Sequence, residues 1–240
     1  MCTVTIVPTN KNDFVLVSNR DEAPNRISLP PENKMCKDTL LMYPEDKESG
    51  GTWIGVSEKN RLICLLNGGF EIHKRKPNYR HSRGIVVKDL LVSDAFQKDI
   101  EEYNLIDIEP FTLVIADWNE NLNFYEFVWD GEQKYFKQLP LEPRIWSSST
   151  LYNDAMKKER QQWFKDYIEG NNLNDYSMFV FHTSAGKGNE DYGVIMDRQF
   201  VKTTSITRFN KEGSKLRMNY FDLLKDKHYY AILNSKNIEA

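Results

Sequence analysis

Short apolar runs separated by turn-forming residues characterise much of the chain. Residues 3–7 and 14–17 are rich in β-branched and aromatic side chains, and residues 8–13 between them have the composition of a turn, so they predict a hairpin. A proline-rich loop is expected between Pro24 and Pro31. The same reasoning predicts a strand that ends at Trp146 and strands over residues 52–56, 61–66, 111–116, 124–129, 135–139, 178–181, 193–196 and 201–207.

Helical spacing interrupts these strands in two places. Between Gly84 and Tyr103 the apolar positions follow the period of an amphipathic helix, and Ser93 is a candidate break. Residues 153–169 carry apolar side chains on one face and end before Gly170, a residue type that commonly stops helices. Because strands and helices do not alternate regularly, the pattern predicts an α+β fold.

Composition indicates a globular protein. The 240 residues are 40% hydrophobic, which is enough for a continuous core, so we expect a single domain over residues 1–240. The formal net charge is -3, and neither a run of about 18 apolar residues nor a secretory leader is evident. We therefore expect a cytoplasmic protein with no nucleic-acid partner and no integral membrane segment. Its cysteines and histidines lack the spacing of metal ligands.

Hairpin geometry predicts that a cysteine, an arginine and a carboxylate converge. If the turn is centred near Lys11, paired residue numbers sum to about 22, which puts Cys2 opposite Arg20 and beside Asp21. Removal of Met1 would leave Cys2 with a free α-amine, whose ordinary pKa of about 7.7–8.0 suits it to accept the thiol proton. Arg20 would favour the thiolate, and Asp21 would either hold the amine or orient the arginine. The alternative is an incidental cysteine beside an ion pair at a strand end.

A candidate oxyanion site follows the predicted strand over residues 61–66. Asn67, Gly68 and Gly69 offer an amide side chain and backbone N–H groups, and acyl transfer needs such donors to stabilise developing negative charge. An Asn-Gly pair is also a common hairpin turn. The sequence leaves both interpretations open.

Three motifs appear in order over the first third of the chain. The tetrapeptide NRDE lies at residues 19–22, after an initial Met-Cys, and is followed by GGTWIGV at residues 50–56 and SRG at residues 82–84. Weaker signals are the serine-rich residues 147–151 and the strand over residues 203–207. Together these motifs resemble those of the NRDE family, also called the Transport and Golgi organisation 2 family.

That resemblance implies both a fold and a chemistry. The family is similar to N-terminal-nucleophile hydrolases of the choloylglycine hydrolase and penicillin V acylase branch, which have a four-layer αββα sandwich of mainly antiparallel sheets and cleave linear amides. The implied catalytic residues are Cys2, Arg20, Asp21, Asn67 and Arg208. The expected substrate-binding residues are Asn19, Trp53, Gly68, Tyr79, Arg83 and Ser148. No cofactor is expected for hydrolysis.

One departure from the branch concerns the second oxyanion donor. Where that branch has an asparagine before the main helix, this chain has serines at residues 147–149. A serine hydroxyl can donate a hydrogen bond, but it is shorter than an asparagine amide. The plain alternative for these serines is helix N-capping.

Two functions compete for the predicted pocket, and both imply a small-molecule partner. The first is a cysteine amidohydrolase acting on a small linear amide or acyl conjugate. The second is a non-catalytic carrier of haem or a lipid-like ligand, since members of the family have been connected with haem trafficking and lipid balance. The basic residues between His73 and Arg83 would suit carboxylates or phosphates, and a solvated loop is the alternative. A third interpretation is an adaptor. The sequence does not specify an oligomeric state.

Overall fold

The computed structural model describes residues 3–234, which fold into two antiparallel sheets and four helices. The six-stranded sheet contains, in spatial order, β10 (Arg144–Ser147), β1 (Thr3–Pro8), β2 (Phe14–Glu22), β11 (Lys202–Glu212), β12 (Lys215–Asp222) and β13 (Lys227–Asn234). The seven-stranded sheet contains β3 (Ser28–Cys36), β4 (Thr39–Asp46), β5 (Ile54–Ser57), β6 (Arg61–Asn67), β7 (Phe111–Asp117), β8 (Asn123–Trp129) and β9 (Lys134–Leu139). The helices are α1 (Arg83–Val92), α2 (Phe96–Glu102), α3 (Asp154–Gly170) and α4 (Asp175–Ser184).

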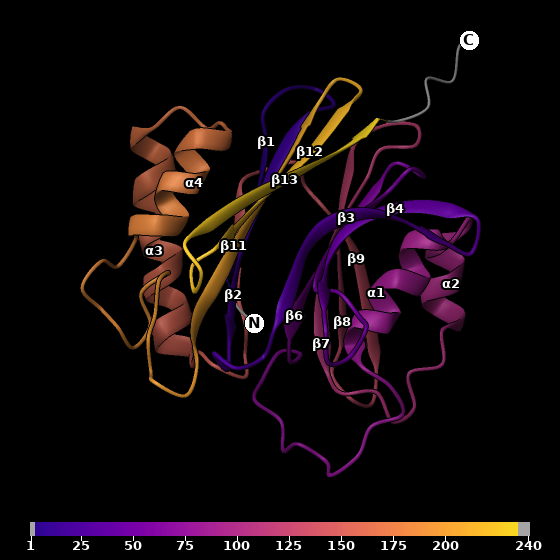
Figure 1. Ribbon diagram of the computed structural model, residues 1–240, viewed down its shortest axis with the longest axis horizontal. Coiled ribbons are helices and arrows are strands. Elements are labelled where there is room, and N and C mark those ends of the chain that lie inside the picture. The colour runs from indigo at the N-terminus through magenta and orange to yellow at the C-terminus, as the bar shows by residue number, and fades with distance from the viewer. Residues whose placement is uncertain (1–2, 235–240) are drawn as a thin grey trace.

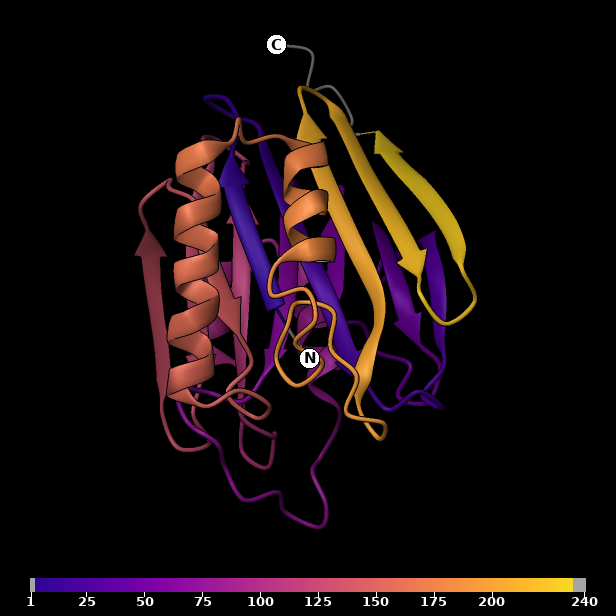
Figure 2. The same ribbon diagram turned by 90° about the vertical axis from the view of Figure 1, so that its left-hand side faces the viewer.

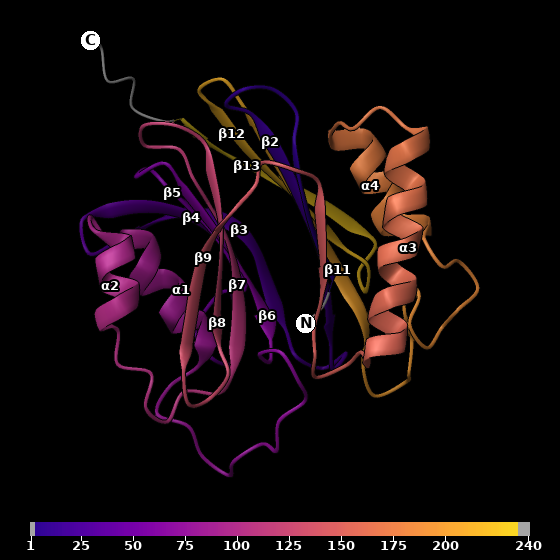
Figure 3. The ribbon, with the colours of Figure 1, turned by 180° about the vertical axis from the view of Figure 1, so that it is seen from behind.

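The two sheets stack face to face and the helices cover their outer faces (Figure 1). Helices α3 and α4 lie over the six-stranded sheet (Figure 2), and α1 and α2 lie on the seven-stranded sheet (Figure 3). This layering confirms the predicted α+β fold with an αββα sandwich. No helix within residues 3–234 is long and apolar enough to span a membrane.

The alternation of side chains along β2 explains why both faces of its sheet are covered. Phe14 and Leu16 belong to the apolar core between the two sheets, whereas Val15 and Val17 belong to the smaller core beneath α3 and α4. All four side chains are buried. A strand covered on both faces has a continuous apolar run, and residues 14–17 have that pattern.

The first hairpin has the predicted register. Thr3 pairs with Asn19 and Pro8 pairs with Phe14, so paired numbers sum to 22. Cys2 lies outside the described residues, so its pairing with Arg20 stays a prediction.

Two predicted strands near the C-terminal third are wrong. Residues 178–181 lie in α4, because Asn174 and Ser177 form a capping box and start a helix whose buried positions are Met178, Phe181 and His182. Residues 193–196 run as irregular chain. The capping signal therefore decides the structure of this segment, although its aromatic residues also suit a strand.

The predicted proline-rich loop is wrong in its second half, because β3 begins at Ser28, whereas residues 24–27 lie outside the strands. Pro30 and Pro31 lie where the β3–β4 register shifts between Leu29 and Glu32. Strand β3 is at the edge of its sheet, and a bulge on an edge strand tolerates the missing N–H of proline. The predicted break at Ser93 is confirmed, since Ser93 is the C-cap of α1.

Candidate active site

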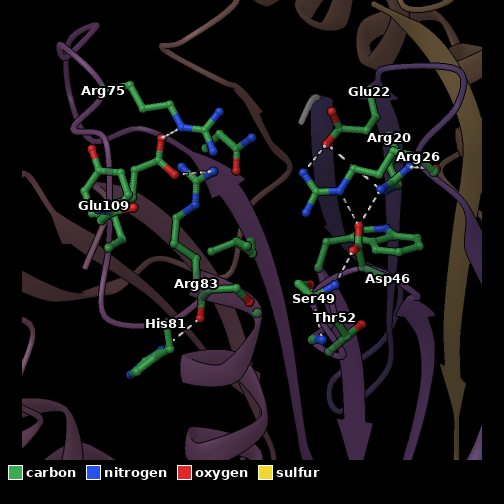
Figure 4. Close-up of a pocket in the computed structure, with 18 of the residues that line it drawn as sticks. Arg20, Glu22, Arg26, Asp46, Ser49, Thr52, Arg75, His81, Arg83 and Glu109 are labelled. Carbon is green, nitrogen blue, oxygen red and sulfur yellow. Dashed lines mark hydrogen bonds and ion pairs between the residues drawn. The ribbon is translucent and has the colours of Figure 1, made fainter. Parts of the chain in front are cut away.

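A cavity of about 320 Å³ opens where β2, β4 and β6 end. Residues 75–84, which precede and begin α1, form much of its opposite wall. Figure 4 shows the charged side chains in two groups, one around Asp46 and one around Glu109. Of the residues predicted for the site, the cavity brings together Arg20, Trp53, Asn67, Tyr79 and Arg83.

Arg20 is held rigidly at the first wall. Its Nη2 donates to Asp46 Oδ2 at 2.8 Å, and its Cζ lies 4.7 Å from the centroid of the Trp53 ring, which is a cation–π contact. Only 1% of Arg20 is exposed. Its Nε has no hydrogen-bond partner among the residues that the structure describes. The guanidinium is therefore fixed by its neighbours and retains one donor.

Asp46 is a site residue that the sequence pattern does not reveal. The same Oδ2 that accepts from Arg20 also accepts from Arg26 Nε at 2.8 Å, and Oδ1 accepts from the Ser49 amide at 3.0 Å. Burial acts to raise the pKa of Asp46, but the Ser49 amide and the two guanidinium groups hold that pKa below its ordinary value. No sequence spacing links Asp46 to Arg20, because only the stacking of the sheets brings β4 over β2.

Asp21 and Asn19 have their partners on the helix-facing side of β2. Asp21 accepts hydrogen bonds from Tyr152 Oη at 2.6 Å and from Thr203 Oγ1 at 2.7 Å. Asn19 Nδ2 donates to the main-chain oxygens of His182 at 3.0 Å and Val194 at 2.6 Å. Asn19 therefore attaches the α4 segment to β2 and does not line the cavity, which corrects its predicted role in binding substrate. The carboxylate that orients Arg20 is that of Asp46.

The main chain of Asn67 is held by a hydrogen bond from the serine-rich segment. Ser148 Oγ donates to the main-chain oxygen of Asn67 at 2.7 Å, so Ser148 positions Asn67 and does not itself line the cavity. Gly68 has φ of +85°, and a Cβ added there would collide with Ser149 Oγ, so only glycine fits. The Gly68 N–H donates to Pro110 O at 2.9 Å. This corrects its predicted availability to an oxyanion and leaves the Asn67 side chain as the candidate donor.

The second wall is built around Glu109. Arg83 Nη2 lies 3.1 Å from Glu109 Oε2, and His73 Nε2 and Arg75 Nε lie 3.3 Å and 3.9 Å from Oε1. Burial lowers the pKa of Arg83, and the Glu109 carboxylate partly offsets that effect. Tyr79 also lines the cavity, and its hydroxyl accepts a hydrogen bond from the Lys76 N–H at 2.9 Å. His73, Arg75 and Arg83 of the basic loop are thus paired with Glu109.

Arg208 lies away from the cavity. In the β2–β11 register it pairs with Val17, and it shares the helix-facing side of the sheet with that residue. Its Nη1 is 3.6 Å from Asp175 Oδ2, and its Cζ is 5.4 Å from the centroid of the Phe179 ring. The structure therefore does not bring Arg208 together with Arg20, which corrects the prediction, since strand alternation separates their faces.

Comparisons with known proteins agree with this architecture. The chain matches the Transport and Golgi organisation 2 family over residues 1–229. No curated protein sequence matches it significantly. Among solved structures, the Caenorhabditis elegans ortholog of N-acylethanolamine-hydrolyzing acid amidase has a TM-score of 0.59 at 11% identity, covering 86% of this chain and 92% of that one.

Two bacterial hydrolases are also similar in structure. Conjugated bile acid hydrolase from Clostridium perfringens has a TM-score of 0.54 at 9% identity, covering 98% of this chain and 97% of that one. Penicillin V acylase from Agrobacterium tumefaciens has a TM-score of 0.54 at 12% identity, covering 95% and 85%. At these identities the similarity establishes a shared fold, that of the N-terminal-nucleophile hydrolases. With the match over residues 1–229, the chain belongs to the Transport and Golgi organisation 2 family.

Proposed function

We propose that the protein is an N-terminal cysteine amidohydrolase that acts on a small linear amide or acyl conjugate. The observation that carries this proposal is the β1–β2 register, in which Thr3 pairs with Asn19. Continued by one residue, this register would pair Cys2 with Arg20, whose guanidinium lines a cavity that also contains Asn67. The three similar structures are a hydrolysing amidase, a hydrolase and an acylase, which supports the same class of reaction.

The proposed reaction assigns a role to each of these groups. Once Met1 is removed, the α-amine of Cys2 accepts the thiol proton, and the thiolate forms a C–S bond with the acyl carbon. The Asn67 amide donates a hydrogen bond to the oxyanion, and Arg20 stabilises the thiolate. Collapse breaks the C–N bond, and the α-ammonium protonates the departing amine. Water then hydrolyses the thioester, which restores the thiol and releases the acid.

Cys2 variants and the mass of the mature chain test this proposal. We expect the mature chain to begin at Cys2, and Cys2→Ala to reduce amide hydrolysis by at least about 10³-fold and to abolish labelling by a cysteine-reactive acyl-amide probe. Cys36→Ser is the matched control, since Cys36 is half-buried at the end of β3, and it should retain both. Retention of Met1 in active protein would exclude catalysis assisted by the α-amine.

The charge of the cavity favours a second candidate function, which is carriage of an anionic ligand such as haem. Four arginines, at positions 20, 26, 75 and 83, and three carboxylates, at positions 22, 46 and 109, line it, which leaves one formal positive charge. Arg75 would hold the propionates of haem, and His81 on the same wall would offer an imidazole to its iron. Titration with micromolar haem should then give a saturable Soret shift that His81→Ala weakens and Cys2→Ala retains. No saturable change contradicts carriage of haem.

A further inference from the structure

A buried polar network lies on the helix-facing side of the six-stranded sheet, next to the start of β1. Tyr152 Oη donates to one oxygen of the Asp21 carboxylate at 2.6 Å, and Thr203 Oγ1 donates to the other at 2.7 Å. All three residues are buried. Two donors on two oxygens fix the plane of the carboxylate as well as its position. Both donors are neutral hydroxyls.

The Tyr152 ring is itself held in place by cations. Arg160 Cζ lies 3.6 Å from the ring centroid, and Arg198 Cζ lies 5.6 Å from it. Arg160 is completely buried and donates to the main-chain oxygens of Tyr192 and Gly193, both at 2.8 Å. These contacts fix the Tyr152 hydroxyl relative to the sheet, because the ring cannot shift without displacing a guanidinium that has several partners.

The same Arg160 guanidinium also reaches the start of β1. Its Nη1 donates to Thr3 Oγ1, and Thr3 is the first residue that the structure describes. Thr3 pairs with Asn19 of β2. Asp21 lies two residues beyond Asn19. Because the strands are antiparallel, this is the direction in which β1 is extended toward the N-terminus. One network thus holds both Thr3, the first described residue of β1, and the Asp21 carboxylate.

We infer that Tyr152 is a positioning residue, which orients the Asp21 carboxylate to receive the α-ammonium of Cys2. This inference rests on the proposed function, since it concerns the proton that the thiol transfers to the amine. With the carboxylate in place, the ammonium–thiolate form is stabilised. Without the hydroxyl, the carboxylate is less well oriented, the ammonium is held less firmly and the thiol is ionised less at neutral pH.

The pH dependence of Cys2 alkylation by iodoacetamide tests this role without a known substrate. A Cys36→Ser background leaves Cys2 as the reactive thiol, because Cys64 is fully buried and its burial raises the pKa of that thiol to about 12. In this background Tyr152→Phe, which keeps the ring, should slow alkylation at pH 7 on the order of tenfold and move the profile to higher pH. Tyr167→Phe removes a hydroxyl that donates to Ser177 O at 2.7 Å and should leave the profile unchanged.

A double-mutant cycle separates positioning from a general loss of stability. If the hydroxyl acts through Asp21, Tyr152→Phe should have no further effect in an Asp21→Asn background. An unchanged profile in Tyr152→Phe, or the full effect persisting beside Asp21→Asn, overturns the inference. If Tyr152→Phe does not fold, as judged by circular dichroism, Thr203→Val removes the other hydroxyl donor and takes its place in the cycle.

The two proposals fail in different ways. An ordinary thiol profile for Cys2 in the parent protein, with no hydrolysis of amides, contradicts the proposed amidohydrolase. A lowered thiol pKa in the parent that Tyr152→Phe leaves unchanged contradicts only the role of Tyr152. The cycle is measurable in either case, because alkylation requires a thiol and no turnover.

Discussion

Alternate residues of the NRDE tetrapeptide have different surroundings. Arg20 and Glu22 line the cavity, whereas Asn19 and Asp21 bond to residues on the helix-facing side of the sheet. Side chains of a strand alternate between its faces, so a motif that is continuous in sequence serves two layers of the molecule. Its arginine depends on Asp46 for orientation, and the pair lies among the least exposed charges of the site.

Replacing Asp46 tests that dependence. Asp46→Asn leaves the buried Arg20 with only the Glu22 carboxylate, whose Oε2 lies 3.9 Å from Nη2, so we expect the free energy of unfolding at pH 7 to fall by about 3 kcal/mol in urea denaturation. Glu102→Gln, which removes the exposed pair with Lys98, is the control and should change it by no more than about 0.5 kcal/mol. Equal stability of Asp46→Asn and the parent protein contradicts the assignment.

The stability of the same variant should also respond differently to acid. Because the folded-state pKa of Asp46 is lowered, the stability that its ionisation contributes is present above its unfolded pKa of about 3.9. This contribution is lost as the pH falls from that value through the folded pKa. When urea denaturation is repeated below pH 4, the free energy of unfolding of Asp46→Asn should therefore fall less with decreasing pH than that of the parent protein.

At the scale of elements, glycines allow α1 to approach the segment before β5. A Cβ on Gly51 would lie 2.9 Å from Gly84 C, and one on Gly84 would lie 2.7 Å from Thr52 N. The GGTW and SRG motifs are thus packed directly against each other, and neither glycine can carry a side chain without displacing main chain. This contact places Arg83, the first residue of α1, at the cavity.

Helix α4 is attached to the six-stranded sheet through a buried histidine. His182 Nε2 lies 2.8 Å from Thr5 Oγ1, and His182 Nδ1 lies 2.7 Å from Asn19 Oδ1. Burial, with a further contribution from the charge of Arg160, lowers the pKa of His182 to about 3. The imidazole is therefore neutral in the folded protein at neutral pH, and protonation favours the unfolded chain.

Stability should consequently fall in mild acid. The unfolded pKa is about 6.5, so the contribution of His182 is complete above that pH and is lost progressively down to about pH 3. Between pH 7 and pH 5 we expect a loss of about 2 kcal/mol from this group in urea denaturation. His182→Gln should be less stable at pH 7, because it loses the imidazole contacts, and should show a smaller difference between the two pH values. An identical difference in both proteins contradicts the prediction.

At the scale of the whole molecule, one aromatic cluster joins the two sheets. Between ring centroids, Phe14 of β2 lies 5.4 Å from Trp118, which directly follows β7, 5.8 Å from Phe124 of β8 and 5.6 Å from Phe209 of β11. The cavity lies between the ends of the same two sheets. Its geometry therefore depends on how they pack together.

Truncating Phe14 should destabilise both sheets together. Phe14→Ala leaves a void in a core shared by the sheets, so we expect the free energy of unfolding to fall by about 3–5 kcal/mol. Phe200→Ala is the control, because that side chain is 74% exposed, and it should change stability by no more than about 0.5 kcal/mol. Circular dichroism and tryptophan fluorescence should report the same midpoint, and separate midpoints would contradict a shared core.

Local sequence was sufficient for several elements and for one register. Residues 3–17 contain two β-rich runs and a short turn, which together determine that Thr3 pairs with Asn19. The long amphipathic pattern before Gly170 predicts α3 for the same reason, since its period is visible within one element. The strand prediction for residues 178–181 is wrong because a short apolar run suits either structure, and its cap decided between them.

Tertiary structure decided which side chains meet at the site. Family motifs indicated Arg20, Trp53 and Arg83, the need for an oxyanion donor indicated Asn67, and the cavity brings the four together. Asp46 could not be found in this way, because it reaches Arg20 only through the stacking of two sheets, and no periodicity within either strand records that contact. Sequence by itself therefore determined the hairpin and the motif residues, whose signals are local. Packing between layers decided the partners of Arg20 and the face on which Arg208 lies, because these depend on contacts between residues far apart in the chain.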